Sequence, residues 1–193
     1  MSAAAARHRV FVDAVRMLSR PRPRRRSDYF DSIGFIMQRL GLILAVCVFG
    51  LDQISKPWIL SVFDGGVRFV EVTPFFNLVL VYNRGVSFGL LSNDSSFGPY
   101  ILAGLAIAIA LAIYYFLLRK TDKRIMVIAC GLIIGGAFGN ALDRLLYGAV
   151  VDFLDFHIAG YHWPSFNVAD CAIVVGAFLI AYDGLFGTPN EPK

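Results

Sequence analysis

Four long apolar runs constrain this chain of 193 residues more than any other feature. They cover residues 40–60, 100–118, 125–147 and 166–186, and a helix needs roughly 20 apolar residues to cross a bilayer. Of all residues, 57% are hydrophobic and only 17% are charged, whereas about 25% of a soluble domain is charged. The sequence therefore predicts a membrane protein with four transmembrane helices.

The distribution of positive charge predicts how these helices are oriented, since cytoplasmic segments are enriched in lysine and arginine. Eight arginines precede Arg39, and the short link after the second run holds Arg119, Lys120, Lys123 and Arg124. Residues 148–165 contain neither lysine nor arginine. We therefore expect both termini in the cytoplasm, and residues 61–98 and 148–165 on the outer side.

Residues 1–34 form a basic leader that we expect to be disordered, and we expect the same of the tail, residues 187–193. A leader of this kind is more typical of a cytoplasmic tail beside anionic lipid than of a nucleic-acid arm. A cleaved signal peptide is the alternative, but the apolar run is long and no A-x-A site follows it.

Residues 67–72 and 75–82 are rich in β-branched and aromatic residues and are bounded by Pro74 and Asn83-Arg84-Gly85. Each stretch is too short to cross a bilayer as a helix. The predicted fold is thus an all-α membrane protein whose four transmembrane helices carry a small extracytoplasmic β-sheet. Residues 148–165 are interpreted as a loop.

Polar residues interrupt the first apolar run. Asp52 and Lys56 are four residues apart and share a helix face, which favours an ion pair over a direct catalytic role. In the fourth run, Asn167 and Asp170 are three residues apart. Asn167 fits a helix N-cap and a functional site equally well, and one residue can serve as both.

The third run combines a polar stripe with small residues. The stripe repeats at helical spacing near the end of the run and consists of Asn140, Asp143, Arg144 and Tyr147. It is either a solvated helix end or part of a site, and its position beside Asp152 favours a site. Gly131, Gly135 and Gly139 recur every four residues, which predicts close helix packing.

Two carboxylates flank the 148–165 connection, Asp152 and Asp170. Antiparallel helices would bring them face to face at the outer membrane boundary. Such a pair retains a proton and titrates as a unit. It suits amide hydrolysis, because one member takes a proton from water while the other polarises the carbonyl. A proton or ion relay uses intramembrane acids as well, so both readings stay open on spacing alone.

Other reactive residues point to no metal and no disulfide. Cys47, Cys130 and Cys171 lie within apolar runs, where free cysteine behaves as a small hydrophobe. His157 and His162 are five residues apart without a partner motif, which is a weak zinc signal.

Four sequence blocks resemble the prolipoprotein signal peptidases, also called signal peptidase II. They are DQISKPWI from Asp52, NRGVSFGLL from Asn83, GGAFGNALDRLLYGAVVDFLDF from Gly135 and FNVADCAIVVG from Phe166. The resemblance covers roughly residues 35–186, interpreted as one peptidase domain.

The resemblance implies an aspartic peptidase of the bacterial cytoplasmic (inner) membrane with its active site near the outer face. It would remove signal peptides from diacylglyceryl-modified prolipoproteins, just before the lipidated cysteine, without a cofactor. Its partners would be these substrates and membrane lipids but no nucleic acid, and we expect a monomer. The resemblance maps the catalytic aspartates to Asp152 and Asp170. It maps supporting positions to Asp52, Lys56, Asn83, Gly85, Asn140, Asp143, Arg144 and Asn167.

Two other classes of function are alternatives to the peptidase. A small proton-coupled transporter would show internal symmetry between halves, and no repeat is visible between the first two and last two runs. A non-enzymatic assembly factor would keep its function after loss of both acids.

Overall fold

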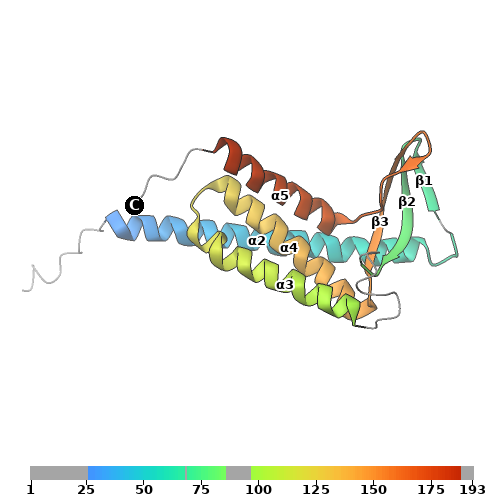
Figure 1. Ribbon diagram of the computed structural model, residues 1–193, viewed down its shortest axis with the longest axis horizontal. Coiled ribbons are helices and arrows are strands. Elements are labelled where there is room, and N and C mark those ends of the chain that lie inside the picture. Colours follow the sequence, from blue (N-terminus) through green and yellow to red (C-terminus); the bar gives the residue numbers. More distant parts are fainter. Residues whose placement is uncertain (1–25, 68, 86–96, 188–193) are drawn as a thin grey trace, which may run out of the picture. The chain divides into compact units, whose positions relative to one another are not determined.

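The structure is a computed structural model that describes residues 26–67, 69–85 and 97–187 (Figure 1). The chain divides into two units, residues 1–33 and 34–193, and the residues discussed below lie in the second. The predicted leader lies outside the described residues as far as residue 25, and helix α2 begins at Arg26. The predicted tail also lies outside them, apart from Gly187.

Four long helices account for the four apolar runs. They are α2 (Arg26–Val62), α3 (Gly98–Phe116), α4 (Arg124–Tyr147) and α5 (Val168–Phe186). The segments long and apolar enough to cross a membrane are Gly34–Val62, Gly98–Lys120, Arg124–Tyr147 and Val168–Phe186. The predicted spans are thereby confirmed, with ends shifted by a few residues.

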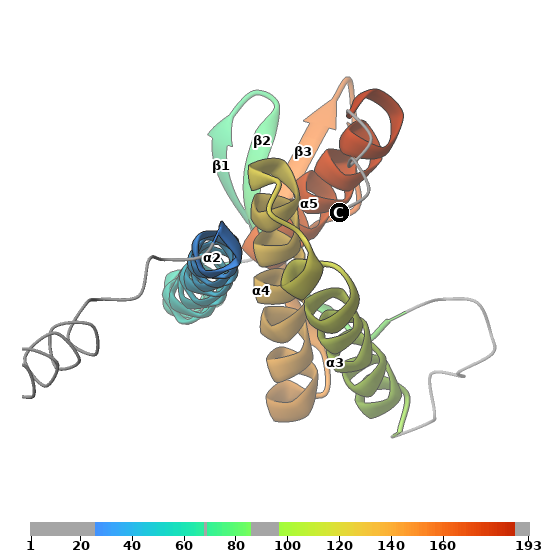
Figure 2. The same cartoon turned by 90° about the vertical axis from the view of Figure 1, so that its left-hand side faces the viewer.

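Helix α4 is the central helix of the second unit. Figure 2 shows it between α2 and α3, and it also packs along α5. Most of its span is buried, whereas the other three spans expose large apolar side chains over most of their length. Apolar side chains that face outward suit a lipid environment, so α4 is the helix best placed to carry polar groups away from lipid.

The glycines of α4 allow α2 to approach closely. A Cβ atom at Gly131 would lie 2.6 Å from the carbonyl oxygen of Gly41, and one at Gly135 would lie 2.5 Å from that of Ala45. Neither backbone could tolerate a side chain there. The packing role predicted from four-residue spacing is confirmed, and it sets the distance between the polar groups of the two helices.

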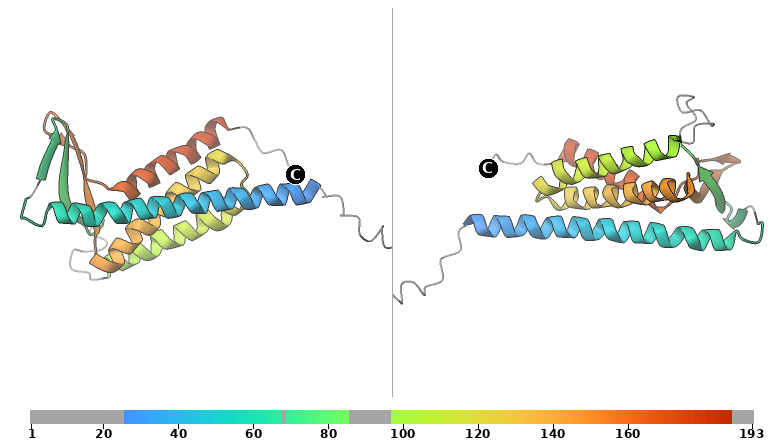
Figure 3. Two further views of the ribbon diagram at one scale, coloured as in Figure 1. Left: turned by 180° about the vertical axis from the view of Figure 1, so that it is seen from behind. Right: turned by 90° about the horizontal axis from the view of Figure 1, so that it is seen from below.

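A four-stranded antiparallel sheet lies at the end of the helices where α2 finishes (Figures 1 and 3). Its strands follow the order β1 (Phe69–Thr73), β2 (Phe76–Asn83), β3 (Val150–Ile158) and β4 (Tyr161–His162). Ile59 of α2 and Phe63, the residue after α2, pack against Phe153 of β3 in a small buried cluster. This cluster attaches the sheet to the helices.

The interpretation of residues 148–165 as a loop was wrong, since they supply β3 and β4. Gly148 adopts a left-handed conformation with φ 65° and ends α4. The β-branched pair Val150 and Val151 then begins the strand, and both are buried. In sequence this apolar pair looks like a continuation of the third span, which is why the strand was missed.

Candidate active site

A buried ion-pair network joins α2 to α4. Lys56 Nζ lies 2.6 Å from Asp52 Oδ2 and 2.8 Å from Asp143 Oδ2, and all three side chains are at most 2% exposed. The predicted Asp52–Lys56 pair is thus confirmed, with Asp143 as an additional partner. One lysine between two carboxylates leaves a formal charge of −1, which further donors must stabilise.

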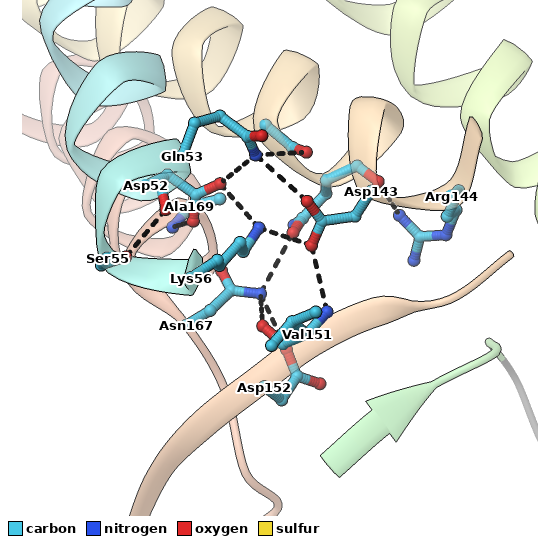
Figure 4. A network of polar contacts seen from close by, with 12 residues as sticks. Asp52, Gln53, Ser55, Lys56, Asp143, Arg144, Val151, Asp152, Asn167 and Ala169 are labelled. Atoms are coloured by element: carbon cyan, nitrogen blue, oxygen red, sulfur yellow. Dashed lines mark hydrogen bonds and ion pairs between the residues drawn. The ribbon is translucent and has the colours of Figure 1, made fainter. Parts of the chain in front are cut away.

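Those donors come from a side chain and from two backbone amides (Figure 4). Gln53 Nε2 donates to Asp52 Oδ2 and to Asp143 Oδ1, at 3.1 Å in each case. The N–H of Ala169 donates to Asp52 Oδ1, and the N–H of Val151 donates to Asp143 Oδ2, both at 3.0 Å. The network therefore ties α2 and α4 to the start of α5 and to β3.

Asp152 and Asp170 are linked through two asparagines. Asn167 Nδ2 donates to Asp152 Oδ1 at 2.7 Å and to Asn140 Oδ1 at 3.1 Å. Asn140 Nδ2 in turn donates to Asp170 Oδ1 at 2.7 Å. Asp152 is 1% exposed and Asp170 is half-buried, so the chain of hydrogen bonds leads from a buried carboxylate to a more accessible one.

Asn167 caps α5 and belongs to this chain of hydrogen bonds. Its Oδ1 accepts from the N–H of Asp170 at 2.9 Å, the N-cap contact, while its Nδ2 binds Asp152. The N-cap role is therefore confirmed, and the same side chain also contacts a candidate catalytic carboxylate. The cap also fixes where Asp170 stands on the first turn of the helix.

Asn83 and Gly85 reach the site from the end of β2. Asn83 Nδ2 donates to Asp152 Oδ2 at 3.0 Å, and Asn83 Oδ1 accepts from the N–H of Gly85, also at 3.0 Å. Gly85 has φ 109°, a conformation that favours glycine. A Cβ atom there would also collide with the Leu102 side chain. Glycine at this position thus allows the turn that directs the Asn83 amide to Asp152.

Arg144 lies within electrostatic reach of Asp170, Asp152 and Asp143. Its Nη1 donates to the carbonyl oxygen of Asn140 at 3.2 Å. Its Nε is buried and has no hydrogen-bond partner. A buried donor without a partner is uncommon in proteins, so this atom is a candidate to bind a substrate oxygen.

The local environment raises the pKa of Asp152. Burial has the largest effect, and the nearby charge of Asp170 adds to it. Hydrogen bonds from Asn83 and Asn167 act in the opposite direction, and the pKa comes to about 6 instead of 3.8. Asp152 is therefore poised to change its protonation state near neutral pH, as acid–base catalysis requires.

This raised pKa predicts how stability depends on pH. Because the folded pKa exceeds the unfolded value, the contribution of protonated Asp152 to stability is fully present below pH 3.8 and is lost as pH rises through 6. Relative to Asp152→Asn, the wild-type protein should lose about 2 kcal/mol of unfolding free energy between pH 4 and 8. Thermal unfolding of both proteins in detergent across this range measures the difference, and a constant difference would contradict it.

The two histidines with a weak zinc signal in the sequence have other contacts. His162 Nδ1 lies 2.9 Å from both carboxylate oxygens of Asp155, and the His157 ring stacks on the His162 ring at 4.8 Å. Within the part of the chain that the structure describes, no group of three or more His, Cys, Asp or Glu side chains could hold a metal ion.

Sequence reasoning missed or misplaced parts of the site. Asp152 lies on β3 and not at a helix end, so the expected meeting of two antiparallel helices was wrong. Gln53 was missed, although its three-residue spacing from Lys56 could have indicated a shared face. Tyr147 of the predicted polar stripe is exposed, whereas Asn140 and Asp143 are buried. The stripe is therefore buried at Asn140 and Asp143 and solvated at Tyr147, and its role in a site stays a prediction.

Gly139 of α4 packs directly against the ion-pair network. A Cβ atom there would lie 2.5 Å from Asp52 Oδ2 and 3.4 Å from the Ala169 Cβ. We expect Gly139→Ala to cost about 1–3 kcal/mol, because the buried carboxylate must leave its donors. Gly104→Ala is the matched control, since nothing lies within 4 Å of the Cβ position on α3. Equal melting temperatures for the two variants would contradict this expectation.

Comparisons with known proteins support the resemblance noted above. Residues 44–186 match the family model described as Signal peptidase (SPase) II. A lipoprotein signal peptidase of Burkholderia vietnamiensis is 49% identical over 152 residues, which are 79% of this chain and 90% of the relative. The relative from Burkholderia thailandensis is 45% identical over 155 residues, or 80% and 92% of the two chains.

Two solved structures, both described as bacterial membrane enzymes, share the fold. One has 31% identity and a TM-score of 0.61, and it covers 79% of this chain and 94% of its own. The other has 33% identity and a TM-score of 0.64, and it covers 77% and 94%. These comparisons give no support to the transporter alternative. The chain is a multi-pass bacterial membrane protein that belongs to the signal peptidase II family.

Proposed function

We propose that this protein is an aspartic endopeptidase that removes signal peptides from diacylglyceryl-modified prolipoproteins, cleaving before the lipidated cysteine. The observation that carries the proposal is the hydrogen-bonded chain from Asp152 through Asn167 and Asn140 to Asp170. The names of the relatives, lipoprotein signal peptidases, supply the substrate class.

In the proposed reaction, the two carboxyl groups hold one proton and act as a unit. The ionised group takes a proton from water, whose oxygen attacks the scissile carbonyl carbon. The protonated group donates a hydrogen bond to the carbonyl oxygen and stabilises the developing charge. As the tetrahedral intermediate collapses, the C–N bond breaks and the leaving nitrogen receives the proton that the first carboxyl group took from water. These steps need no metal and no organic cofactor.

The surrounding residues are proposed to position the carboxylates and the peptide. Asn140 and Asn167 orient the acids, and the buried Nε of Arg144 is available to a peptide oxygen. The remaining supporting residues hold the elements that carry the acids: Asp52, Lys56, Asn83, Gly85 and Asp143. Much of the rate enhancement would then come from positioning.

We also propose that the site faces the outer side of the bacterial inner membrane, with both termini in the cytoplasm. Lysine and arginine gather in the leader and in the link after the second span, as expected for cytoplasmic segments. The substrate would keep its lipid in the bilayer while its signal helix lies among the spans. One copy of the chain carries every residue assigned to the site, which fits a monomer.

The test is incubation of the purified protein with a synthetic diacylglyceryl-modified lipopeptide, followed by mass spectrometry of the products. We expect cleavage immediately before the modified cysteine and none of the same peptide without its lipid. Cleavage at another bond, or equal cleavage of the unmodified peptide, would contradict the proposed substrate class. Activity retained by Asp152→Asn would contradict the aspartic mechanism.

A further inference from the structure

The segment that returns from β3 to Asn167 makes few backbone hydrogen bonds with β3. This return segment, residues 159–167, begins with two left-handed residues, Ala159 at φ 49° and Gly160 at φ 83°. Its backbone pairs with β3 through the two residues of β4, through a hydrogen bond from the Trp163 N–H to the Phe156 carbonyl oxygen at 2.8 Å, and through a bridge between Phe166 and Leu154. Its far end is nevertheless Asn167, whose amide must reach Asp152.

Packing does not hold the middle of the return segment. Trp163, Pro164 and Ser165 line a cavity of about 780 Å³, and the Trp163 side chain is 70% exposed. Pro164 has no N–H to donate to a neighbouring strand. Polar contacts must therefore fasten this part of the chain to the sheet.

Besides the Trp163 N–H, one buried carboxylate supplies side-chain contacts of this kind. Asp155 of β3 accepts from His162 Nδ1 of the return segment at 2.9 Å and from Asn77 Nδ2 of β2 at 3.0 Å. We call these three residues the clasp. Asp155 is 5% exposed, so its charge depends on these donors. Burial raises the pKa of Asp155, but the hydrogen bonds from His162 and Asn77 outweigh it and hold the pKa below its usual value.

The clasp and the active site fasten the same two segments at opposite ends. Asp155 follows Asp152 by three residues on β3, and His162 precedes Asn167 by five residues on the return segment. At one end His162 binds Asp155, and at the other end Asn167 binds Asp152. If the first contact is lost, the backbone hydrogen bonds of Phe166 with Phe153 and Leu154 are the main restraint left beside Asn167. A shift of the return segment against β3 would then carry the Asn167 amide away from Asp152.

We propose that Asp155 and His162 are positioning residues for the reaction: by fastening the return segment to β3 they fix Asn167, and through it the orientation of Asp152. The inference rests on the proposed function. It adds Asp155 and His162, which lie outside the site around Asp152 and Asp170, to the residues that support the reaction. His162 acts through Asn167 and does not touch the substrate.

Three variants test the proposal in the full-length protein with the diacylglyceryl-modified lipopeptide. His162→Leu removes the donor, whereas His162→Asn places an amide nitrogen where Nδ1 stood. Tyr161→Ala is the matched control, because the neighbouring Tyr161 side chain is 82% exposed. We expect His162→Leu to lower kcat about tenfold with KM within about twofold, while the other two variants stay within about threefold of wild type.

The pH profile separates positioning from loss of fold. A displaced Asn167 no longer lowers the pKa of Asp152. In a plot of cleavage rate against pH, the change caused by ionisation of the aspartate pair should therefore move to higher pH in His162→Leu. The other titratable groups near His162 are Asp155, His157 and Glu71, which line the same cavity and are unchanged in this variant. An unmoved profile with normal kcat would overturn the proposal, as would His162→Asn performing as poorly as His162→Leu.

Hydrogen exchange tests the inference independently of activity. The Asp170 N–H is bonded to Asn167 Oδ1, so its exchange should rise about tenfold in His162→Leu and stay unchanged in Tyr161→Ala. Unchanged exchange in His162→Leu would overturn the inference even if the enzyme were active. If the wild-type protein failed to cleave the lipopeptide, the proposed function would fall while the exchange result still decided the role of the clasp.

Discussion

Asp152→Asn and Asp170→Asn are each expected to lower kcat for lipopeptide cleavage by about 10³-fold or more. An amide can neither take a proton from water nor give one to the leaving nitrogen, and acid–base groups typically contribute 10²–10⁴-fold. The two carboxyl groups are linked through Asn167 and Asn140 and act on one reaction centre. The double variant should therefore be little worse than either single variant.

Asp64→Asn is the matched control, since Asp64 is exposed in the turn after α2. It should cleave at the wild-type rate. Both active-site variants should still insert into membranes and purify as folded protein, because asparagine has nearly the shape of aspartate. Near-normal cleavage by either variant would remove that residue from the catalytic pair, and a multiplicative loss in the double variant would show that the two carboxyl groups act separately.

Lys56→Met is expected to have the largest effect on stability. It leaves Asp52 and Asp143 buried together without their shared cation, whose distances to them are 2.6 and 2.8 Å. Removing one member of a buried ion-pair network typically costs about 3–5 kcal/mol. We expect little folded protein in the membrane fraction and a large fall in the melting temperature of what remains.

A second substitution tests the electrostatic cause. In the background of Lys56→Met, changing Asp143 to asparagine removes one of the two unpaired charges and should recover part of the lost stability. Lys120→Met serves as the control, because Lys120 is exposed beside the ring of Phe116 and should be dispensable. If the double variant were less stable than Lys56→Met alone, buried charge would not be the reason for the loss.

The sequence predicted those parts of the site that depend on spacing within one element. Asp52 and Lys56 pair because four residues make about one helical turn, and the N-cap role of Asn167 follows from its place at the start of the fourth apolar run. The approximate limits of the spans follow from apolar length alone. In each case the information lies within a few neighbouring residues.

Contacts between distant elements were not predictable in the same way. The third member of the ion-pair network, Asp143, reaches Lys56 because the glycines of α4 let α2 approach, which no local pattern specifies. The strand that carries Asp152 was hidden because the apolar pair Val150 and Val151 extends the hydropathy of the third span. The pairing of Asp155 with His162 depends on a chain reversal at residues 159–160, which the sequence marks only by one glycine.

The hydrogen bond from the Ala169 amide to Asp52 Oδ1 has a consequence for biosynthesis. Asp52 is made early and Ala169 emerges from the ribosome 117 residues later. A nascent chain that has inserted its first three helices lacks the Ala169 N–H that donates a hydrogen bond to this carboxylate, and it also lacks Asp170. Proteolytic competence must therefore arise only after the start of α5 has been made, so truncated products that lack α5 should be inert towards lipoprotein precursors.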